Sequence, residues 1–152
     1  MKIRFIENIE EKEIISRTIL TQLPEWFGLP DSTNEYIQNS KTMPFWACLD
    51  EDKPIGFIAL KATSDFTAEV YVMGVLKELH RNGIGKALFE SAKKSACEKG
   101  YSFLQVKTVQ MGKYEVYDKT NRFYLSLGFK EFEIFPTLWD EWNPCQIYVM
   151  AL

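Results

Sequence analysis

The chain has 152 residues, 46% hydrophobic and 26% charged, with a formal net charge of −3, which suits a single globular domain spanning residues 1–152. Because the net charge is negative, the chain has no general excess of positive charge with which to bind nucleic acid, so we expect no nucleic-acid partner. The three cysteines are far apart and His80 is the only histidine, so we expect neither a disulfide framework nor a metal centre.

The N-terminal segment Met1–Glu10 carries charges where a signal peptide would need an apolar run, and no apolar stretch approaches membrane-spanning length. We therefore expect a cytoplasmic protein without a membrane partner. Alternating apolar and polar residues predict a strand over Lys2–Glu7. Asn8 and Glu11 have the spacing of a capping box, which predicts a helix that continues to about Leu23.

An aromatic loop, Glu25–Pro30, follows Pro24 in the sequence. Asp31 or Ser32 is a suitable N-cap for a short helix through Tyr36. The next segments predict a β-hairpin, with strands over Phe45–Leu49 and Ile55–Thr63 around the turn Asp50–Lys53.

The second half of the chain alternates strands with helices. Its predicted strands are Thr67–Val75, Ser102–Val109, Phe129–Ile134 and Cys145–Ala151, and its predicted helices are Gly83–Lys99 and Asp118–Leu127. The hairpin requires antiparallel pairing, whereas the passage from Thr67 to Val109 has the form of a parallel β-α-β crossover. We therefore expect an α/β fold with a mixed sheet and helices on both faces.

Two glycines open the helix that follows the strand Thr67–Val75, in the run Gly83-Ile84-Gly85-Lys86. The first turn of a helix offers unpaired N–H groups and a positive dipole end, which favour a phosphate or pyrophosphate. Two known phosphate patterns do not fit. A P-loop needs glycine in place of His80 and Ser or Thr in place of Ala87, and a dinucleotide fingerprint needs glycine in place of Leu88. A tight turn without a ligand is the competing interpretation.

This turn resembles the acyl-coenzyme A pyrophosphate loop of the GNAT N-acetyltransferase superfamily. The run Asn121–Phe129 is similar to that superfamily's helix ending in tyrosine, three residues, glycine and phenylalanine, and Phe135–Asp140 with Asn143-Pro144 resembles a group of small bacterial members. The resemblance implies a GNAT fold with a mostly antiparallel sheet of about seven strands, splayed in the middle. Two residues depart from the pattern: His80 replaces glutamine or arginine, and Tyr117 stands where many members carry a cofactor-binding asparagine.

The resemblance also implies acetyl-coenzyme A as the cofactor. Main-chain groups of Met73 and Val75 would bind the pantetheine arm, and Gly74 between them is expected to mark a bulge. Backbone N–H groups from Arg81 to Lys86 would bind the pyrophosphate. The complete set of expected cofactor-binding residues is Met73, Val75, Arg81, Asn82, Gly83, Ile84, Gly85, Lys86 and Asn121.

Acetyl transfer from a thioester requires a neutral amine and a proton for the leaving thiolate. Deprotonating a lysine-like amine of pKa about 10.4 at pH 7 costs roughly 4.6 kcal/mol. Glu69 is the candidate base, acting directly or through water, because some superfamily members carry a glutamate base there. A central strand that is covered on both faces has little tolerance for an unpaired carboxylate, so we expect Glu69 to face a cleft. Alternation places Glu69, Tyr71 and Met73 on one face of the strand. The competing interpretation is a solvated glutamate.

Tyr124 is the candidate acid, a role transferred from the superfamily motif, and the competing interpretation is a core tyrosine packed with Phe123 and Phe129. The expected acceptor-binding residues are Trp26, Phe27, Tyr36, Tyr71 and Trp139.

The acids Glu25, Glu115, Asp140 and Glu141 are expected near these aromatic residues, and the combination suits a cationic amine. Amino acids, polyamines, aminoglycosides and peptide N-termini all remain candidate acceptors. Ile147–Ala151 is a candidate edge strand for a homodimer. The alternative function is a non-catalytic module that senses acyl-coenzyme A or docks a partner.

Overall fold

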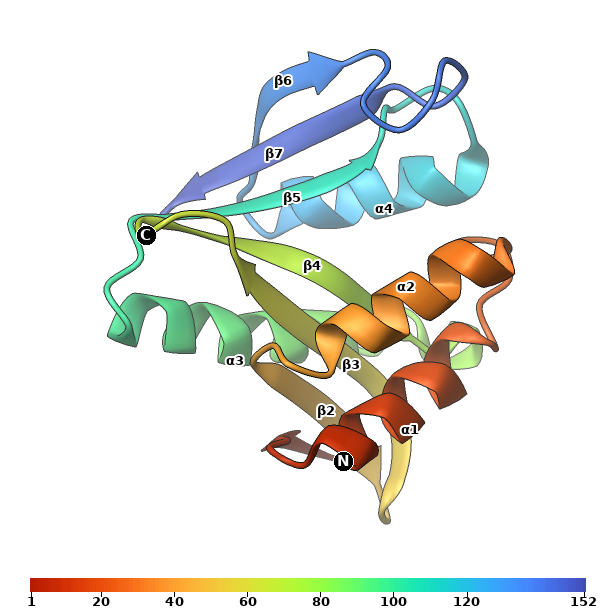
Figure 1. Ribbon diagram of the computed structural model, residues 1–152, viewed down its shortest axis with the longest axis vertical. Helices are drawn as coiled ribbons and strands as arrows, with labels where there is room; N and C mark the ends of the chain where they lie inside the picture. Colours follow the sequence, from red (N-terminus) through yellow and green to blue (C-terminus); the bar gives the residue numbers. More distant parts are fainter.

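The computed structural model describes residues 1–152 and shows one seven-stranded sheet flanked by four α-helices (Figure 1). The strand order is β1-β2-β3-β4-β5-β7-β6, and every neighbouring pair is antiparallel except β4 and β5. The predicted mixed sheet is therefore confirmed. The strands are β1 (Lys2–Phe5), β2 (Phe45–Asp50), β3 (Lys53–Ala62), β4 (Thr67–Val75), β5 (Phe103–Val109), β6 (Lys130–Phe135) and β7 (Cys145–Ala151); the helices are α1 (Ile9–Leu20), α2 (Pro30–Ser40), α3 (Ile84–Glu98) and α4 (Glu115–Ser126), with a 3₁₀ turn η1 (Lys77–Leu79).

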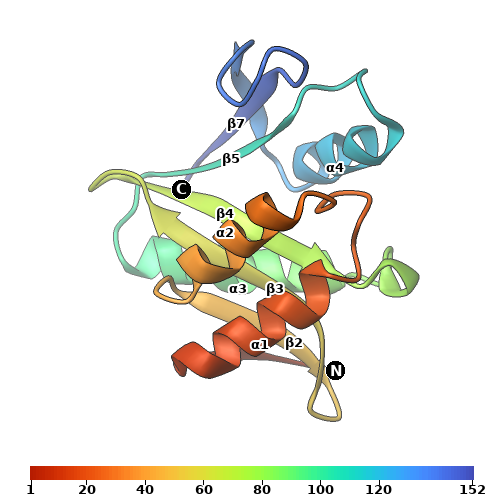
Figure 2. The ribbon, with the colours of Figure 1, turned by 45° about the vertical axis from the view of Figure 1, so that its right-hand side comes forward.

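The helices lie on both faces of the sheet, as expected (Figure 2). A side chain at Gly56 would meet Leu88 of α3, whereas one at Gly74 would meet Leu23 and Ile19, which belong to α1 and the turn after it. Helix α3 thus covers one face of the central strands, and α1 with α2 covers the other. Buried apolar side chains such as Leu88 and Ile19 fill both layers.

The central strands β4 and β5 separate halfway along their length. They pair only from Thr67 opposite Phe103 to Val70 opposite Val106, and beyond that point β5 pairs with β7 alone. Figures 1 and 2 show β4 and β5 diverging from this point, which confirms the expected splay. The last residues of β4 therefore have a free edge.

The bulge in β4 lies at Tyr71, three residues before the glycine where we expected it. Ala59 is paired with Val72 and Leu60 with Val70, so Tyr71 is the extra residue, and no register shift occurs at Gly74. The position of the extra residue depends on the register with β3, which the local sequence of β4 does not contain. The prediction of a bulge at Gly74 is wrong.

The bulge reverses the alternation of side chains along β4. Tyr71 faces α2, where its hydroxyl accepts a hydrogen bond of 2.8 Å from Asn39. Met73 lies on the opposite face, where its methyl group is close to Gly85 of α3. The predicted grouping of Met73 with Glu69 and Tyr71 is therefore wrong, because it assumed an unbroken strand.

Three further expectations need correction. Helix α1 ends at Leu20, before Leu23, while α2 extends past Tyr36 to Ser40, because Ile37 and Ser40 are buried. Strand β7 is not an edge strand: it lies between β5 and β6, so Ile147–Ala151 has no free edge for pairing with a second copy. None of the helices combines the length and the apolar character that a membrane span requires.

Candidate functional site

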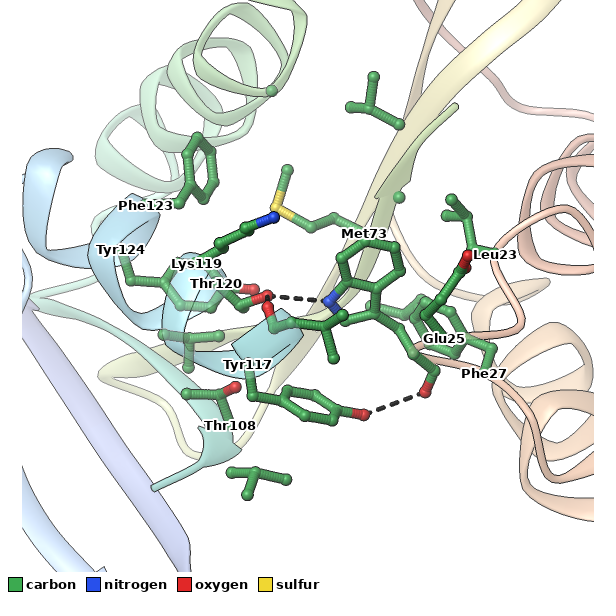
Figure 3. A pocket seen from close by; sticks show the side chains of 18 of the residues that line it. Leu23, Glu25, Phe27, Met73, Thr108, Tyr117, Lys119, Thr120, Phe123 and Tyr124 are labelled. Carbon is green, nitrogen blue, oxygen red and sulfur yellow. Dashed lines mark hydrogen bonds between the residues drawn. The ribbon is translucent and has the colours of Figure 1, made fainter. Parts of the chain in front are cut away.

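A cleft of about 1320 Å³ opens where β4 and β5 part (Figure 3). Its walls come from the α1–α2 loop, β4, the start of α3, β5, α4 and the β6–β7 loop. Because β5 leaves β4 after Val70, the gap in the sheet joins the α3 side of the molecule to the α2 side.

The N-terminus of α3 forms one end of the cleft. Gly83, the N-cap residue, has a φ of 77°, and no side chain caps the helix. No acidic residue lies in its first turn, so its first N–H groups are free to bind an anion. A side chain at Gly85 would come within 3.1 Å of Phe123 in α4, so a larger residue there would have to displace this ring.

Four cations line this end of the cleft: Arg81, Lys86, Lys119 and Arg122. None of them forms an ion pair. Sequence reasoning missed the two on α4, although their three-residue spacing on the predicted helix was a usable signal. Asn82 does not line the cleft, because its side-chain amide donates to Leu79 O and His80 O within the loop.

The main chain of β4 exposes a free edge to the cleft. Leu76 N–H donates to Ile55 O at 3.0 Å, which sets the alternation of hydrogen-bonded pairs between β3 and β4. Val75 opposite Gly56 and Met73 opposite Ile58 then fall at non-bonded positions, so their N–H and C=O groups point away from β3. The ring nitrogen Nε2 of His80 contacts Val75 O at 2.7 Å, which leaves the remaining groups free.

Tyr124 lines the cleft although the residue is only 7% exposed. It packs against Phe123, Phe129 and Tyr148. Its hydroxyl forms no hydrogen bond within the protein, and since no buried polar side-chain atom lacks a partner, this oxygen must reach the cleft. Burial raises the pKa of Tyr124 well above its ordinary value of 10, so the hydroxyl keeps its proton at neutral pH.

Glu69 is buried and does not line the cleft. Its Oε1 accepts a hydrogen bond from Gln105 Nε2 at 2.8 Å and lies 3.1 Å from Lys107 Nζ in an ion pair. Lys107 does line the cleft. The expectation that Glu69 faces the cleft is therefore not met: the cleft meets Lys107, and the carboxylate lies behind it.

Asn121 is fully buried and cannot contact a ligand with its side chain. Its amide donates to Val109 O at 2.8 Å and to Tyr117 O at 2.7 Å, while its Oδ1 accepts from Tyr148 at 2.6 Å. These bonds attach α4 to β5 and β7. The prediction that Asn121 binds the cofactor is wrong for this reason.

The expected acceptor residues Phe27, Tyr36 and Tyr71 form one aromatic cluster. Ring centroids lie 5.7 Å apart for Phe27 and Tyr36 and 5.3 Å apart for Tyr36 and Tyr71. Burial raises the pKa of Tyr36 to about 12. Trp139 lines the cleft from the β6–β7 loop.

Trp26 connects the α1–α2 loop to α4 across the cleft. Its indole donates to Thr120 Oγ1 at 3.1 Å, and its carbonyl accepts from the Tyr117 hydroxyl at 3.0 Å, the two dashed lines in Figure 3. Tyr117, the departure from the superfamily pattern, thus anchors this loop.

The acidic lining expected for a cationic acceptor is largely absent. Of the four acids, only Glu25 and Asp140 line the cleft, and Glu115 and Glu141 do not. Glu25 pairs with Lys77 at 3.0 Å. The hydrogen bonds that Asp140 accepts from the side-chain amide of Asn143 and from the N–H groups of Trp142 and Asn143 hold the pKa of its carboxyl below the ordinary value.

Solved structures share this fold over nearly the whole chain. A protein from Desulfovibrio desulfuricans described as a GNAT-family acetyltransferase has a TM-score of 0.82 at 17% identity, covering 99% of this chain and 98% of its own. The aminoglycoside 6'-N-acetyltransferase from Enterococcus faecium has a TM-score of 0.78 at 20% identity, covering 99% and 97%. A GNAT acetyltransferase from Elizabethkingia anophelis, solved with acetyl-CoA bound, has a TM-score of 0.71 at 16% identity, covering 90% of each chain.

The sequence itself also matches a family model. No curated protein matches it, but the model described as the acetyltransferase (GNAT) domain matches residues 41–131, more than half of the chain. The matched segment includes β4, the glycine turn, α3 and Tyr124. This chain therefore belongs to the GNAT family of acetyltransferases.

Proposed function

We propose that this protein transfers an acetyl group directly from acetyl-coenzyme A to a small primary amine. The observation that carries the proposal is that three features line one cleft: the free N–H groups of α3, the free edge of β4 and the unpartnered hydroxyl of Tyr124. Together they match the parts of a long thioester donor, which has a diphosphate, an amide-bearing arm and a sulfur.

The residues present fit coenzyme A. The N–H groups at the start of α3 suit the diphosphate, and the four cations around them add favourable charge. The main-chain groups of Met73 and Val75 suit the amides of the pantetheine arm, in the way that a peptide adds to a sheet edge. When bound, acetyl-coenzyme A supplies the activated acetyl thioester.

Tyr124 is the proposed proton donor to the departing sulfur. Because burial raises its pKa, the hydroxyl keeps its proton throughout the neutral range and is available to donate a hydrogen bond to the developing thiolate. The thiolate takes the proton as the C–S bond breaks, and water then returns a proton to the tyrosine oxygen. Glu69 is the proposed acceptor of the amine proton, acting through water, because Lys107 stands between it and the cleft. Phe27, Tyr36 and Tyr71 are proposed to hold the amine beside the gap between β4 and β5.

The Tyr124→Phe variant tests the acid. We expect kcat to fall about a hundredfold while KM for acetyl-coenzyme A changes little, since the lost hydroxyl acts on the leaving group. In the wild type, the raised pKa of Tyr124 should keep its hydroxyl active up to about pH 9, so no loss of kcat from its ionisation is expected below that pH. Steady-state kinetics over this range measure both effects.

Tyr101→Phe is the matched control, because Tyr101 lies outside the cleft. A Tyr124→Phe enzyme that keeps wild-type turnover would contradict the assigned role. A protein that is stabilised by coenzyme A in a melting experiment but acetylates no amine would instead be the non-catalytic alternative.

A further inference from the structure

Lys107 lines the cleft from the side of the sheet that faces α2, whereas Lys61, whose Nζ lies 5.7 Å from the ring centroid of Tyr71, does not line the cleft. Val106 is opposite Tyr148, whose hydroxyl bonds to Asn121 in α4, so Val106 faces α4 and its neighbour Lys107 points to the other face of the sheet. Tyr71 lies on this face as well, because it bonds to Asn39 in α2. We call this region the acceptor half, defined by Phe27, Tyr36, Tyr71 and Lys107.

The ammonium of Lys107 is held in place and is only partly used. Its Nζ lies 3.1 Å from Glu69 Oε1 in an ion pair and donates no hydrogen bond to another protein group, so its N–H groups are available to a ligand. The side chain is 32% exposed while that of Glu69 is 7% exposed, so a ligand in the cleft meets the ammonium first. Because Glu69 balances the charge, Lys107 recognises an anion mainly through direct hydrogen bonds.

The cleft offers a single carboxylate without a cationic partner, which is too little to compensate a multiply charged amine. Glu25 is paired with Lys77, while Asp140 accepts hydrogen bonds only from neutral groups of its own loop and keeps its charge. Binding a polyamine or an aminoglycoside would therefore leave several ammonium groups without partners near Lys107. An apolar body, in contrast, would pack against the three rings of the acceptor half.

We infer that the acceptor is a monoamine of the amino-acid class, with its carboxylate bound by Lys107 and its apolar side chain packed against Phe27, Tyr36 and Tyr71. This inference rests on the proposed function. It assigns Lys107 as a specificity-determining residue that contacts the substrate.

Matched pairs of amines test the inference. Acetylation of phenylalanine is compared with that of phenethylamine, tyrosine with tyramine and tryptophan with tryptamine, and spermidine and kanamycin complete the panel. A lost charged hydrogen bond lowers kcat/KM about 10- to 100-fold, so we expect each amino acid to exceed its decarboxylated partner by this factor. Spermidine and kanamycin should be the poorest acceptors.

Variants at Lys107 assign the preference to this residue. Lys107→Met should reduce the ratio of kcat/KM within each pair to near one, while Lys107→Arg should retain most of it. If Lys107→Met does not fold, the double variant Glu69→Gln/Lys107→Met removes both charges, and the ratio within a pair remains readable even when the overall rate falls. Lys94→Met, on the exposed side of α3, is the control with an unchanged ratio.

The outcomes separate the two claims. Three results would overturn the inference and leave the proposed function intact. They are equal rates of acetylation within each pair, a ratio that Lys107→Met does not change, and spermidine or kanamycin as the best acceptor. Acetylation of none of these amines by a protein that binds acetyl-coenzyme A overturns the proposed function and the inference with it.

Discussion

Glu69 and Lys107 form the one ion pair in which a carboxylate is buried. The Lys107→Met substitution leaves Glu69 inside the sheet with Gln105 as its remaining partner. Since Lys107 is about one-third exposed, the cost is below that of a fully buried pair, and we expect the free energy of unfolding to fall by about 2 kcal/mol. Urea unfolding at neutral pH measures this value.

The double variant Glu69→Gln/Lys107→Met should recover part of that loss, because it removes the unpaired charge. Lys94→Met serves again as the surface control and should change stability by less than about 0.5 kcal/mol. If Lys107→Met proved as stable as the control, the pair would have no structural role and Glu69 would need another source of stabilisation.

The turn between β4 and α3 is an element whose geometry depends on glycine. Gly83 has a φ of 77° and has no atom within 4 Å of where a Cβ would stand, and Gly100, at the other end of α3, shares both properties with a φ of 83°. Each glycine-to-alanine change should therefore cost about 1 kcal/mol of stability from backbone strain. Only Gly83→Ala should also weaken coenzyme A binding, because Gly83 precedes the free N–H groups.

Calorimetric titration of coenzyme A into both variants separates strain from binding. The expected result is weaker binding by Gly83→Ala and wild-type affinity for Gly100→Ala. Equal affinities in the two variants would contradict the assignment of the diphosphate to the start of α3.

Elements with clear local signals were predicted well. Strand β4 has the predicted bounds, and α3 differs from the prediction by one residue at each end because glycines flank it. The hydrogen bond from Glu11 N–H to Asn8 confirms the predicted cap of α1. In contrast, the extension of α2 to Ser40 depends on tertiary burial of Ile37 and Ser40, which local propensity does not contain.

The site was predictable where it is made of main chain and less so where it is made of side chains. The glycine turn follows from one strand–turn–helix segment, whereas the free edge of β4 was expected only from the resemblance to the superfamily, because it depends on where pairing with β5 stops. The contact of Lys107 with Glu69 depends on the register between β4 and β5. The hydrogen bonds that occupy the side-chain amide of Asn121 depend on β7 lying beside β5. Both are set by long-range pairing, so a short motif could not reveal them.

At the scale of the whole molecule, the separation of β4 from β5 makes the cleft. Pairing stops after Val70 and Val106, and the α1–α2 loop reaches α4 across the opening through Trp26. The layers on the two faces of the sheet therefore meet in one space, with the free N–H groups of α3 on one side and the aromatic cluster on the other. In the proposed function, this arrangement lets the donor and the acceptor approach each other through the sheet.

Residue-resolved hydrogen exchange with and without coenzyme A tests this central claim most directly. The account predicts slower exchange for the amides of Met73 and Val75 and for those in the first turn of α3, with no change at Gly100. Unchanged exchange at all of these β4 and α3 amides in the presence of millimolar coenzyme A would contradict it.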